Sequence, residues 1–125
     1  MIDNRCNTSS CKEMQDGKFW CYEANKLAWS QYLGDIGAEE VPPYAAPSRA
    51  SDYSNLPPTY TCIGDLDPFR DETIEYVANL SRAGVPVEFH LYPGCFHGFD
   101  VSIIRSEIGD RAQSEFVDAL ARAFR

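Results

Sequence analysis

Three carboxylates and one histidine are the residues of this sequence best suited to chemistry. Asp65, Asp67 and Asp71 directly follow a short apolar run, and His97 lies in a second polar segment further along the chain. A carboxylate that hydrogen-bonds one nitrogen of an imidazole ring leaves the other nitrogen able to accept a proton, which is the acid–base half of a hydrolytic triad. The alternative is that the acids only cap a helix and complement its positive end, with His97 packed at the end of a strand.

Two predicted strands position these side chains. Residues 59–64 (TYTCIG) and 85–92 (VPVEFHLY) are short, apolar and β-prone, and the first has the pattern of a strand buried on both faces. A strand, a helix and a strand over this length form a βαβ unit, so the two strands should be parallel. Because functional groups gather beyond the carboxyl ends of parallel strands, we expect a carboxylate of Asp65 or Asp67 to meet the imidazole of His97 at one edge of the sheet.

The helix between the strands is predicted to begin at the acids. Asp67 is a candidate N-cap, Pro68 suits the first turn, and Gly84 ends the helix. Its buried face is predicted from helical spacing to consist of Phe69, Thr73, Tyr76, Val77 and Leu80.

Other segments flank this unit. We expect residues 1–18 to be irregular and residues 41–58, which are rich in proline, to form a packed connection. Between them, the sequence predicts a helix from about Phe19 to Gly34. Five of its residues recur at helical spacing and so lie on one face: Trp20, Ala24, Leu27, Ala28 and Tyr32. A C-terminal helix is predicted to open at Asp110, with one face formed by Ala112, Phe116, Ala119, Leu120 and Ala123.

Composition excludes several classes of protein. The formal net charge of −8 disfavours binding to nucleic acid or to an anionic membrane, because phosphates must be met by Lys and Arg. No apolar stretch approaches the roughly 18 residues of a membrane-spanning helix, and the first residues carry no apolar signal-peptide core. A cytoplasmic location is therefore the default expectation.

The cysteines and the second histidine have other interpretations. There are five cysteines, an odd number that disfavours a disulfide framework. Cys6, Cys11 and Cys21 lack the paired spacing and the nearby histidine of a zinc site, so free thiols or one local disulfide fit better. Cys95 lies on the same short loop as His97, which is a poor position for a nucleophile. His90 lies inside the second strand and is expected to be packed or partly exposed. No metal or organic cofactor is implied.

Several segments together resemble a known family. The sequences GDLDPFRDE, AGVPVEFHLYPG and FHGFD are similar to the C-terminal third of α/β-hydrolases, specifically the hormone-sensitive-lipase-like carboxylesterases, and NKLAWSQYLG, VPPYAAPSRASD and LPPTY resemble the region before it. The resemblance implies that Asp67 of the Asp-Pro-x-x-Asp-Glu motif is the catalytic acid and that His97 of the His-Gly-Phe motif is the base. It therefore also implies that these two side chains lie within hydrogen-bond reach of each other. It implies that Asp71 and Glu72 are acids at a helix start and that Asp65 is a turn residue.

The resemblance also indicates what these 125 residues do not contain. The sequence has no G-x-S-x-G nucleophile elbow and no His-Gly-Gly oxyanion loop. We therefore expect residues 1–125 to be one partial α/β-hydrolase domain, a βαβ unit with flanking helices, that supplies the Asp–His half of a serine esterase for short-chain or medium-chain acyl esters and is inactive alone. Two alternatives are one half of a split hydrolase, with the serine on another chain, and a non-catalytic association domain. The apolar residues near the histidine loop, Phe69, Phe96 and Phe99, could line an acyl pocket, although core packing suits at least two of them.

A partner is expected at the surfaces left open. A strand of a parallel sheet is normally paired along both edges, so an unpaired edge beside residues 59–64 and exposed apolar surface favour association. We expect a homodimer that forms through a strand edge or through the helix at residues 110–124. The alternative is that residues 1–22 fold back and cover the unpaired edge.

Overall fold

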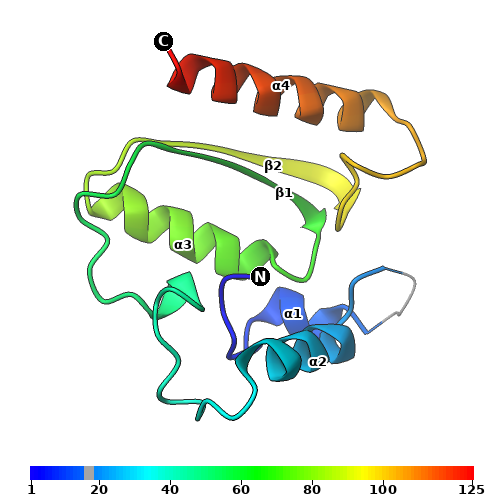
Figure 1. Ribbon diagram of the computed structural model, residues 1–125. Coiled ribbons are helices and arrows are strands. Elements are labelled where there is room, and N and C mark those ends of the chain that lie inside the picture. Colours follow the sequence, from blue (N-terminus) through cyan, green and yellow to red (C-terminus); the bar gives the residue numbers. More distant parts are fainter. Residues whose placement is uncertain (16–18) are drawn as a thin grey trace.

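The computed structural model describes residues 1–15 and 19–125. Two strands form the middle layer, and one helix covers each face of the pair (Figure 1). Of two further helices from the N-terminal part of the chain, the first lies beside the helix that joins the strands, and the second packs against the first (Figure 1). The elements in chain order are α1 (Ser9–Glu13), α2 (Tyr22–Leu33), the 3₁₀ turn η1 (Pro47–Arg49), β1 (Thr59–Leu66), α3 (Arg70–Arg82), β2 (Val87–Phe96) and α4 (Glu107–Ala123).

The predicted βαβ unit is confirmed. β1 and β2 pair in parallel, with Thr59 opposite Val87 and Gly64 opposite Tyr92. Both strands run further than the predicted ranges, because their pairing continues past an irregularity to join Leu66 to Phe96. The prediction that the first strand is buried on both faces is wrong for most of its length, since only Ile63 and Gly64 are buried.

The helix α3 starts later than the sequence indicated. Its assigned N-cap is Phe69, which gives no side-chain cap, so the prediction of Asp67 as the N-cap is wrong. Asp67 instead accepts a hydrogen bond from the backbone N–H of Phe69 (2.8 Å), which closes a tight turn before the helix begins. The predicted face is confirmed, because all of its members are buried or half-buried: Phe69, Thr73, Tyr76, Val77 and Leu80.

The helix α4 begins at Glu107 rather than at Asp110. Ser106 caps it, since its hydroxyl oxygen accepts a hydrogen bond from the N–H of Gly109 (3.1 Å). Of the face predicted for this helix, only Ala112 is buried, and Phe116 and Leu120 are each half-exposed.

The N-terminal segment is more ordered than predicted. Residues 9–13 form α1, capped by Thr8, where the sequence indicated irregular chain; residues 16–18 of the same prediction lie outside the described residues. A core cluster of its own joins α1, α2 and the proline-rich connection, and consists of Cys6, Cys11, Trp29, Val41 and Ala46. The connection is therefore packed, as expected.

The helix α2 is confirmed, but the apolar face predicted from helical spacing is not the face that packs into the core. Leu27 and Tyr32 are exposed, whereas Asn25 and Trp29 are buried. The Asn25 side-chain amide lies 3.4 Å from the sulfur atoms of both Cys6 and Cys11, so a polar side chain occupies a core position because two thiols accept its hydrogen bonds.

Candidate functional site

The site lies where β1 and β2 end, and an irregularity in the pairing shapes it. Gly64 is opposite Tyr92, but Leu66, two residues on, is opposite Phe96, so β2 carries two extra residues at this point. Gly94 lies in this bulge with φ at 72°, a left-handed conformation that suits glycine. Its N–H donates to Asp65 Oδ1 (2.6 Å). Asp65 therefore joins the end of β1 to the bulge of β2.

Gly64 allows the two strands to approach closely beside the bulge. A Cβ at this position would lie 2.6 Å from the carbonyl carbon of Cys95 and closer still to its oxygen. Only glycine fits such an approach without displacing the opposite backbone. The bulge therefore delivers the segment after Cys95, which contains His97, directly over the end of β1.

Asp67 and His97 form a hydrogen-bonded pair at this edge. Asp67 Oδ2 lies 2.8 Å from His97 Nδ1, which confirms the expected geometry. Asp67 is buried with 5% exposure, and its other oxygen accepts the N–H of Phe69. The His97 side chain is 40% exposed, and its Nε2 has no hydrogen-bond partner among residues 1–15 and 19–125. A carboxylate on Nδ1 fixes the ring orientation and leaves Nε2 available for proton transfer.

Aromatic side chains surround the imidazole ring. The Phe69 ring meets it edge-on, with centroids 5.1 Å apart, and the Trp20 ring lies 5.8 Å away. Phe19 stacks on Phe96 at 4.1 Å. Of the three phenylalanines considered for an acyl pocket, Phe69 and Phe99 are buried and Phe96 packs on Phe19. The contacts of Phe19 and Trp20 with this site were not predicted; two adjacent aromatic residues just before a helix start were the only local signal.

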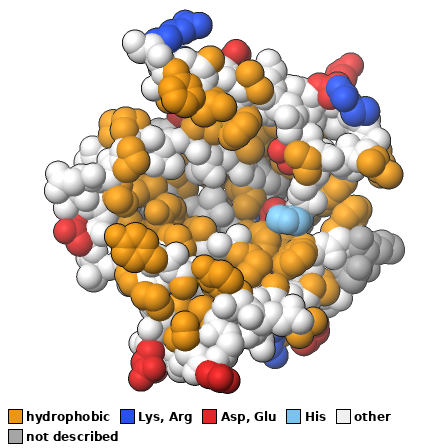
Figure 2. Space-filling view, in the orientation of Figure 1, with side chains coloured by type: hydrophobic (Ala, Val, Ile, Leu, Met, Phe, Trp, Pro, Cys, Tyr) orange, Lys and Arg blue, Asp and Glu red, His pale blue; other side chains and the backbone are white. Residues whose placement is uncertain are grey.

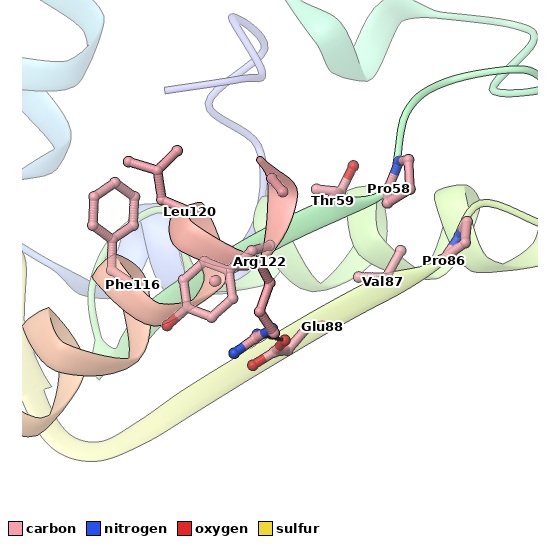
Figure 3. Close-up of a pocket in the computed structure, with 11 residues that line it drawn as sticks. Pro58, Thr59, Pro86, Val87, Glu88, Phe116, Leu120 and Arg122 are labelled. Carbon is pink, nitrogen blue, oxygen red and sulfur yellow. Dashed lines mark hydrogen bonds and ion pairs between the residues drawn. The ribbon is translucent and has the colours of Figure 1, made fainter. Parts of the chain in front are cut away.

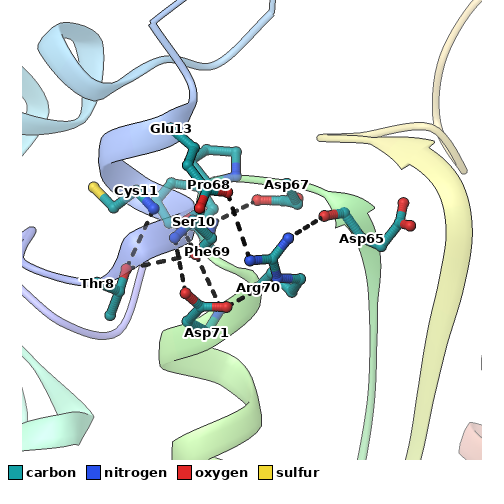
Figure 4. A network of polar contacts seen from close by, with 10 residues as sticks. All are labelled: Thr8, Ser10, Cys11, Glu13, Asp65, Asp67, Pro68, Phe69, Arg70 and Asp71. Atoms are coloured by element: carbon teal, nitrogen blue, oxygen red, sulfur yellow. Dashed lines mark hydrogen bonds and ion pairs between the residues drawn. The ribbon is translucent and has the colours of Figure 1, made fainter.

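Asp71 joins the N-terminal segment to α3 (Figure 4). Its Oδ2 accepts the N–H of Ser10 (2.8 Å), and its Oδ1 accepts the Nε–H of Arg70 (2.9 Å). In return, the backbone N–H of Asp71 donates to Ser10 Oγ (3.1 Å), and that hydroxyl donates to the carbonyl of Pro68 (2.9 Å). Asp71 and Glu72 lie in the first turn of α3 as expected, and Asp71 also connects this turn to α1.

The remaining candidates lie outside the Asp67–His97 pair. All five cysteines are free. Cys95 is buried, and burial raises the pKa of its thiol, which disfavours the reactive thiolate. His90 is partly exposed, and its Nε2 lies 3.1 Å from Glu88 Oε1. No group of three or more side chains within residues 1–15 and 19–125 is arranged to hold a metal ion.

Two surfaces complete the description. Hydrophobic side chains gather around a hollow on the face seen in Figure 2, and a histidine lies at its rim. A separate cavity of about 630 Å³ lies between the strand starts and α4 (Figure 3). Its lining includes Tyr60, Val87, Phe116 and Leu120 but neither Asp67 nor His97.

Within the described part of the chain, none of the helices has the length and apolar character needed to cross a membrane.

The chain is similar to a family of hydrolases and to several esterases. A family profile described as alpha/beta hydrolase fold matches residues 1–101. Esterase LipI of Mycobacterium tuberculosis is 41% identical over 68 residues, which are 54% of this chain and 21% of that protein. Ethyl acetate hydrolase of Pseudomonas putida is 31% identical over 100 residues, which are 79% of this chain and 31% of that protein.

Solved structures show the same likeness. A bacterial heroin esterase superposes with a TM-score of 0.93 and 41% identity, over 100% of this chain and 40% of its own. Esterase LipW of Mycobacterium marinum gives a TM-score of 0.91 and 34% identity, over 99% of this chain and 38% of its own. The chain thus spans between 21% and 40% of the length of these relatives.

Proposed function

Because this chain belongs to the α/β-hydrolase fold family, we propose that it supplies the acid and the base of a serine carboxylesterase. The observation that carries the proposal is the 2.8 Å contact of Asp67 Oδ2 with His97 Nδ1 at the ends of two neighbouring parallel strands. The esterase relatives support the class of reaction.

In the proposed reaction, a serine hydroxyl attacks the carbonyl carbon of an ester. His97 Nε2 accepts the hydroxyl proton and then returns it to the departing alcohol, while Asp67 holds the Nδ1–H tautomer and stabilises the imidazolium. The acyl group then remains on the serine oxygen. Water, deprotonated by the same nitrogen, attacks this acyl-serine and releases the carboxylic acid, and His97 returns the proton to the serine. No cofactor takes part in this scheme.

The serine and the oxyanion-binding N–H groups are proposed to come from polypeptide other than these 125 residues. The sequence contains neither G-x-S-x-G nor His-Gly-Gly. We propose that the chain alone is inactive as an esterase, because the covalent step and the stabilisation of the oxyanion both depend on those groups.

Acyl esters of short or medium chain length are the proposed substrates. Ethyl acetate hydrolase, a relative that is 31% identical, is named for a short ester. The surroundings of His97 are apolar, since Phe69 and Trp20 both lie against its ring. An uncharged acyl or alkyl group suits such surroundings better than a charged one.

The isolated chain tests the inactivity directly. With p-nitrophenyl acetate we expect only the slow release given by a surface imidazole, and no labelling by a serine-directed fluorophosphonate. The residual rate should fall more in His97→Asn than in His90→Asn, the matched control, because His97 Nε2 has no hydrogen-bond partner among residues 1–15 and 19–125, whereas His90 Nε2 lies 3.1 Å from Glu88 Oε1. Turnover like that of an intact esterase, abolished by the fluorophosphonate, would contradict the proposal.

A chimera tests the catalytic roles. The part of the bacterial heroin esterase upstream of the matched region would be fused to residues 1–125, since the two structures superpose over the whole chain. We expect esterase activity that labels with a fluorophosphonate and falls about 10⁴-fold in Asp67→Asn. His97→Gln should fall comparably, and His90→Gln should stay within a few-fold of the chimera. If His90→Gln is as damaging as His97→Gln, the assignment of the base is wrong.

A split hydrolase is the second candidate. Within the described residues β1 has a strand on one side only, so its other edge is open to a strand from another chain. Residues 1–125, mixed with a separately expressed chain that carries the serine and the oxyanion loop, would give esterase activity if the enzyme is split. They would give none if this chain is a non-catalytic association domain.

A cytoplasmic location stays an expectation, and fractionation of the native cells tests it.

A further inference from the structure

Two consecutive aromatic residues of the N-terminal segment pack onto two consecutive residues of the proposed site. The Phe19 ring stacks on the Phe96 ring with centroids 4.1 Å apart, and the Trp20 ring lies 5.8 Å from the imidazole of His97. Phe19 and Trp20 lie just before α2, whereas Phe96 ends β2 and His97 follows it. A segment that is distant in the sequence therefore contacts both the end of β2 and the histidine.

Three rings meet at His97. The centroid of its imidazole lies 5.1 Å from that of Phe69 and 5.8 Å from that of Trp20, and the centroids of Phe69 and Trp20 are 6.2 Å apart. Because these distances are similar, the two aromatic rings form a corner that holds the imidazole, rather than a stack on one side of it. We call Trp20 and Phe69 the aromatic corner. Tilted and edge-on pairs at such separations attract each other.

The hydrogen bond to Asp67 alone does not define the position of the imidazole. Asp67 Oδ2 meets His97 Nδ1 at 2.8 Å, which fixes one atom of the ring. The His97 side chain is 40% exposed, so packing of the ring has to oppose its rotation about this contact toward solvent. A catalytic group must be held within roughly 0.5 Å of its productive position by the side chains that support it. The aromatic corner provides this support.

The two members of the aromatic corner differ in what else they hold. Phe69 is buried, and its backbone N–H donates to Asp67 Oδ1, so a change at Phe69 would also disturb the acid. Trp20 lies outside that turn, and its indole N–H donates no hydrogen bond within residues 1–15 and 19–125. Trp20 therefore acts on the site through the packing of its ring.

We propose that Trp20 is a positioning residue for His97. Its ring, together with that of Phe69, holds the imidazole so that Nδ1 stays on Asp67 and Nε2 stays available for the proton transfers of ester hydrolysis. Phe19 supports the same arrangement by stacking on Phe96. The catalytic consequence rests on the proposed function, whereas the ring contacts belong to residues 1–125 themselves.

NMR of the 125-residue chain at about pH 8, where an ordinary imidazole is neutral, tests these contacts. We expect nuclear Overhauser effects between the indole protons of Trp20 and the ring protons of His97, and a His97 Nδ1–H that exchanges slowly with water. Trp20→Leu keeps an apolar side chain but removes the flat ring, so this proton should exchange about tenfold faster. Trp20→Phe should restore slow exchange, because the indole N–H makes no hydrogen bond within the described residues.

Trp29→Leu is the matched control. Trp29 is buried in the core cluster that contains Cys6 and Cys11, and neither Asp67 nor His97 belongs to this cluster. The control should lower the free energy of unfolding but leave the exchange of the His97 Nδ1–H unchanged. If Trp20→Leu leaves this exchange unchanged, or if Trp29→Leu accelerates it equally, Trp20 does not position His97.

The chimera with the upstream part of the bacterial heroin esterase measures the catalytic consequence. Trp20→Leu should lower kcat about 10-fold to 100-fold with little change in KM, because a misplaced base slows proton transfer without weakening the binding of the substrate. Trp20→Phe should recover most of this loss. A chimera that stays active in His97→Gln contradicts the proposed function. Full activity of Trp20→Leu in a chimera that needs His97 overturns only the role of Trp20. If the chimera has no activity, the exchange measurement alone decides that role.

Discussion

Gly64→Ala should separate the strands at the point that positions His97. The new Cβ would lie 2.6 Å from the carbonyl carbon of Cys95, whereas ordinary contacts begin at 3.4 Å. The backbone of β2 would therefore have to move by at least about 0.8 Å, the difference between these distances, because the carbonyl oxygen of Cys95 lies closer still to the new Cβ. Both contacting atoms belong to the backbone of the bulge, so no side chain can rotate away to make room.

The size of the effect follows from this displacement. Overpacking a filled site costs about 1–3 kcal/mol, and each ladder hydrogen bond stretched out of range costs about 1 kcal/mol more. With one ladder hydrogen bond stretched out of range, we expect Gly64→Ala to lower the free energy of unfolding by about 2–4 kcal/mol. The Asp67–His97 hydrogen bond, now 2.8 Å, would lengthen beyond its normal range if the 95–97 segment moved with the bulge.

Urea unfolding followed by tryptophan fluorescence measures the loss of stability, and NMR of the His97 Nδ1–H reports the hydrogen bond. Gly94→Ala and Gly84→Ala are matched controls, because each glycine has a positive φ (72° and 82°) but nothing within 4 Å of an added Cβ. They should cost only the conformational penalty of about 1–2 kcal/mol. If Gly64→Ala is no more destabilising than Gly94→Ala, the close approach of the strands does not hold the site.

Three further outcomes are expected. Burial raises the folded-state pKa of Glu72 to about 7, above its ordinary 4.5, so the folded chain binds more protons than the unfolded chain between these pH values. The free energy of unfolding should therefore fall by up to about 3 kcal/mol as the pH rises from 4.5 to 7. Chemical denaturation at several pH values should show a weaker dependence of this free energy on pH in Glu72→Gln. Asp71→Ala should destabilise the chain by about 1–3 kcal/mol, because the buried Ser10 N–H loses its acceptor, whereas the exposed Asp118→Ala should have a much smaller effect in the same assay. The isolated chain should sediment as a homodimer that forms through the open edge of β1 or through the half-exposed Phe116 and Leu120 of α4. A monomer at high micromolar concentration would contradict this expectation. A dimer that is unaffected by both Phe116→Glu and Tyr60→Pro would also contradict it.

The parts of the fold that follow local rules were predictable from the sequence. Short apolar runs and helical spacing located β1, α3 and β2, and the strand–helix–strand order over this length predicted that the strands are parallel. The strand ends then predicted that an acid of this segment meets His97, and the family resemblance identified that acid as Asp67. The ends themselves were less predictable: β2 continues through Pro93 and Gly94 because the bulge keeps pairing with β1, and no local pattern encodes a bulge.

Contacts between distant segments were not predictable. Helical spacing of apolar residues leaves Asn25 out of the predicted face of α2, whereas two distant thiols hold its amide in the core. Phe19 and Trp20 reach Phe96 and His97 from the far side of the sequence, which helical spacing alone does not reveal. The spacing of the apolar residues in α4 predicts a shared face, but Phe116 and Leu120 on that face are half-exposed. Periodicity indicates which residues share a face but not whether another element covers it.

The two interpretations of the acids in IGDLDPFRDE are compatible, because Asp67 uses its two oxygens differently. Oδ1 accepts the N–H of Phe69 and closes the turn that starts α3, while Oδ2 meets His97 Nδ1. The structural bond fixes the carboxylate in the plane from which it can orient the imidazole, so the turn holds the proposed catalytic acid in place. The neighbouring acids divide the remaining work: Asp65 accepts the N–H of Gly94 and sets the bulge that carries His97. Asp71 holds α1 to the same turn. A substitution at Asp65 should therefore disturb His97 without touching it, through the position of β2 rather than through charge.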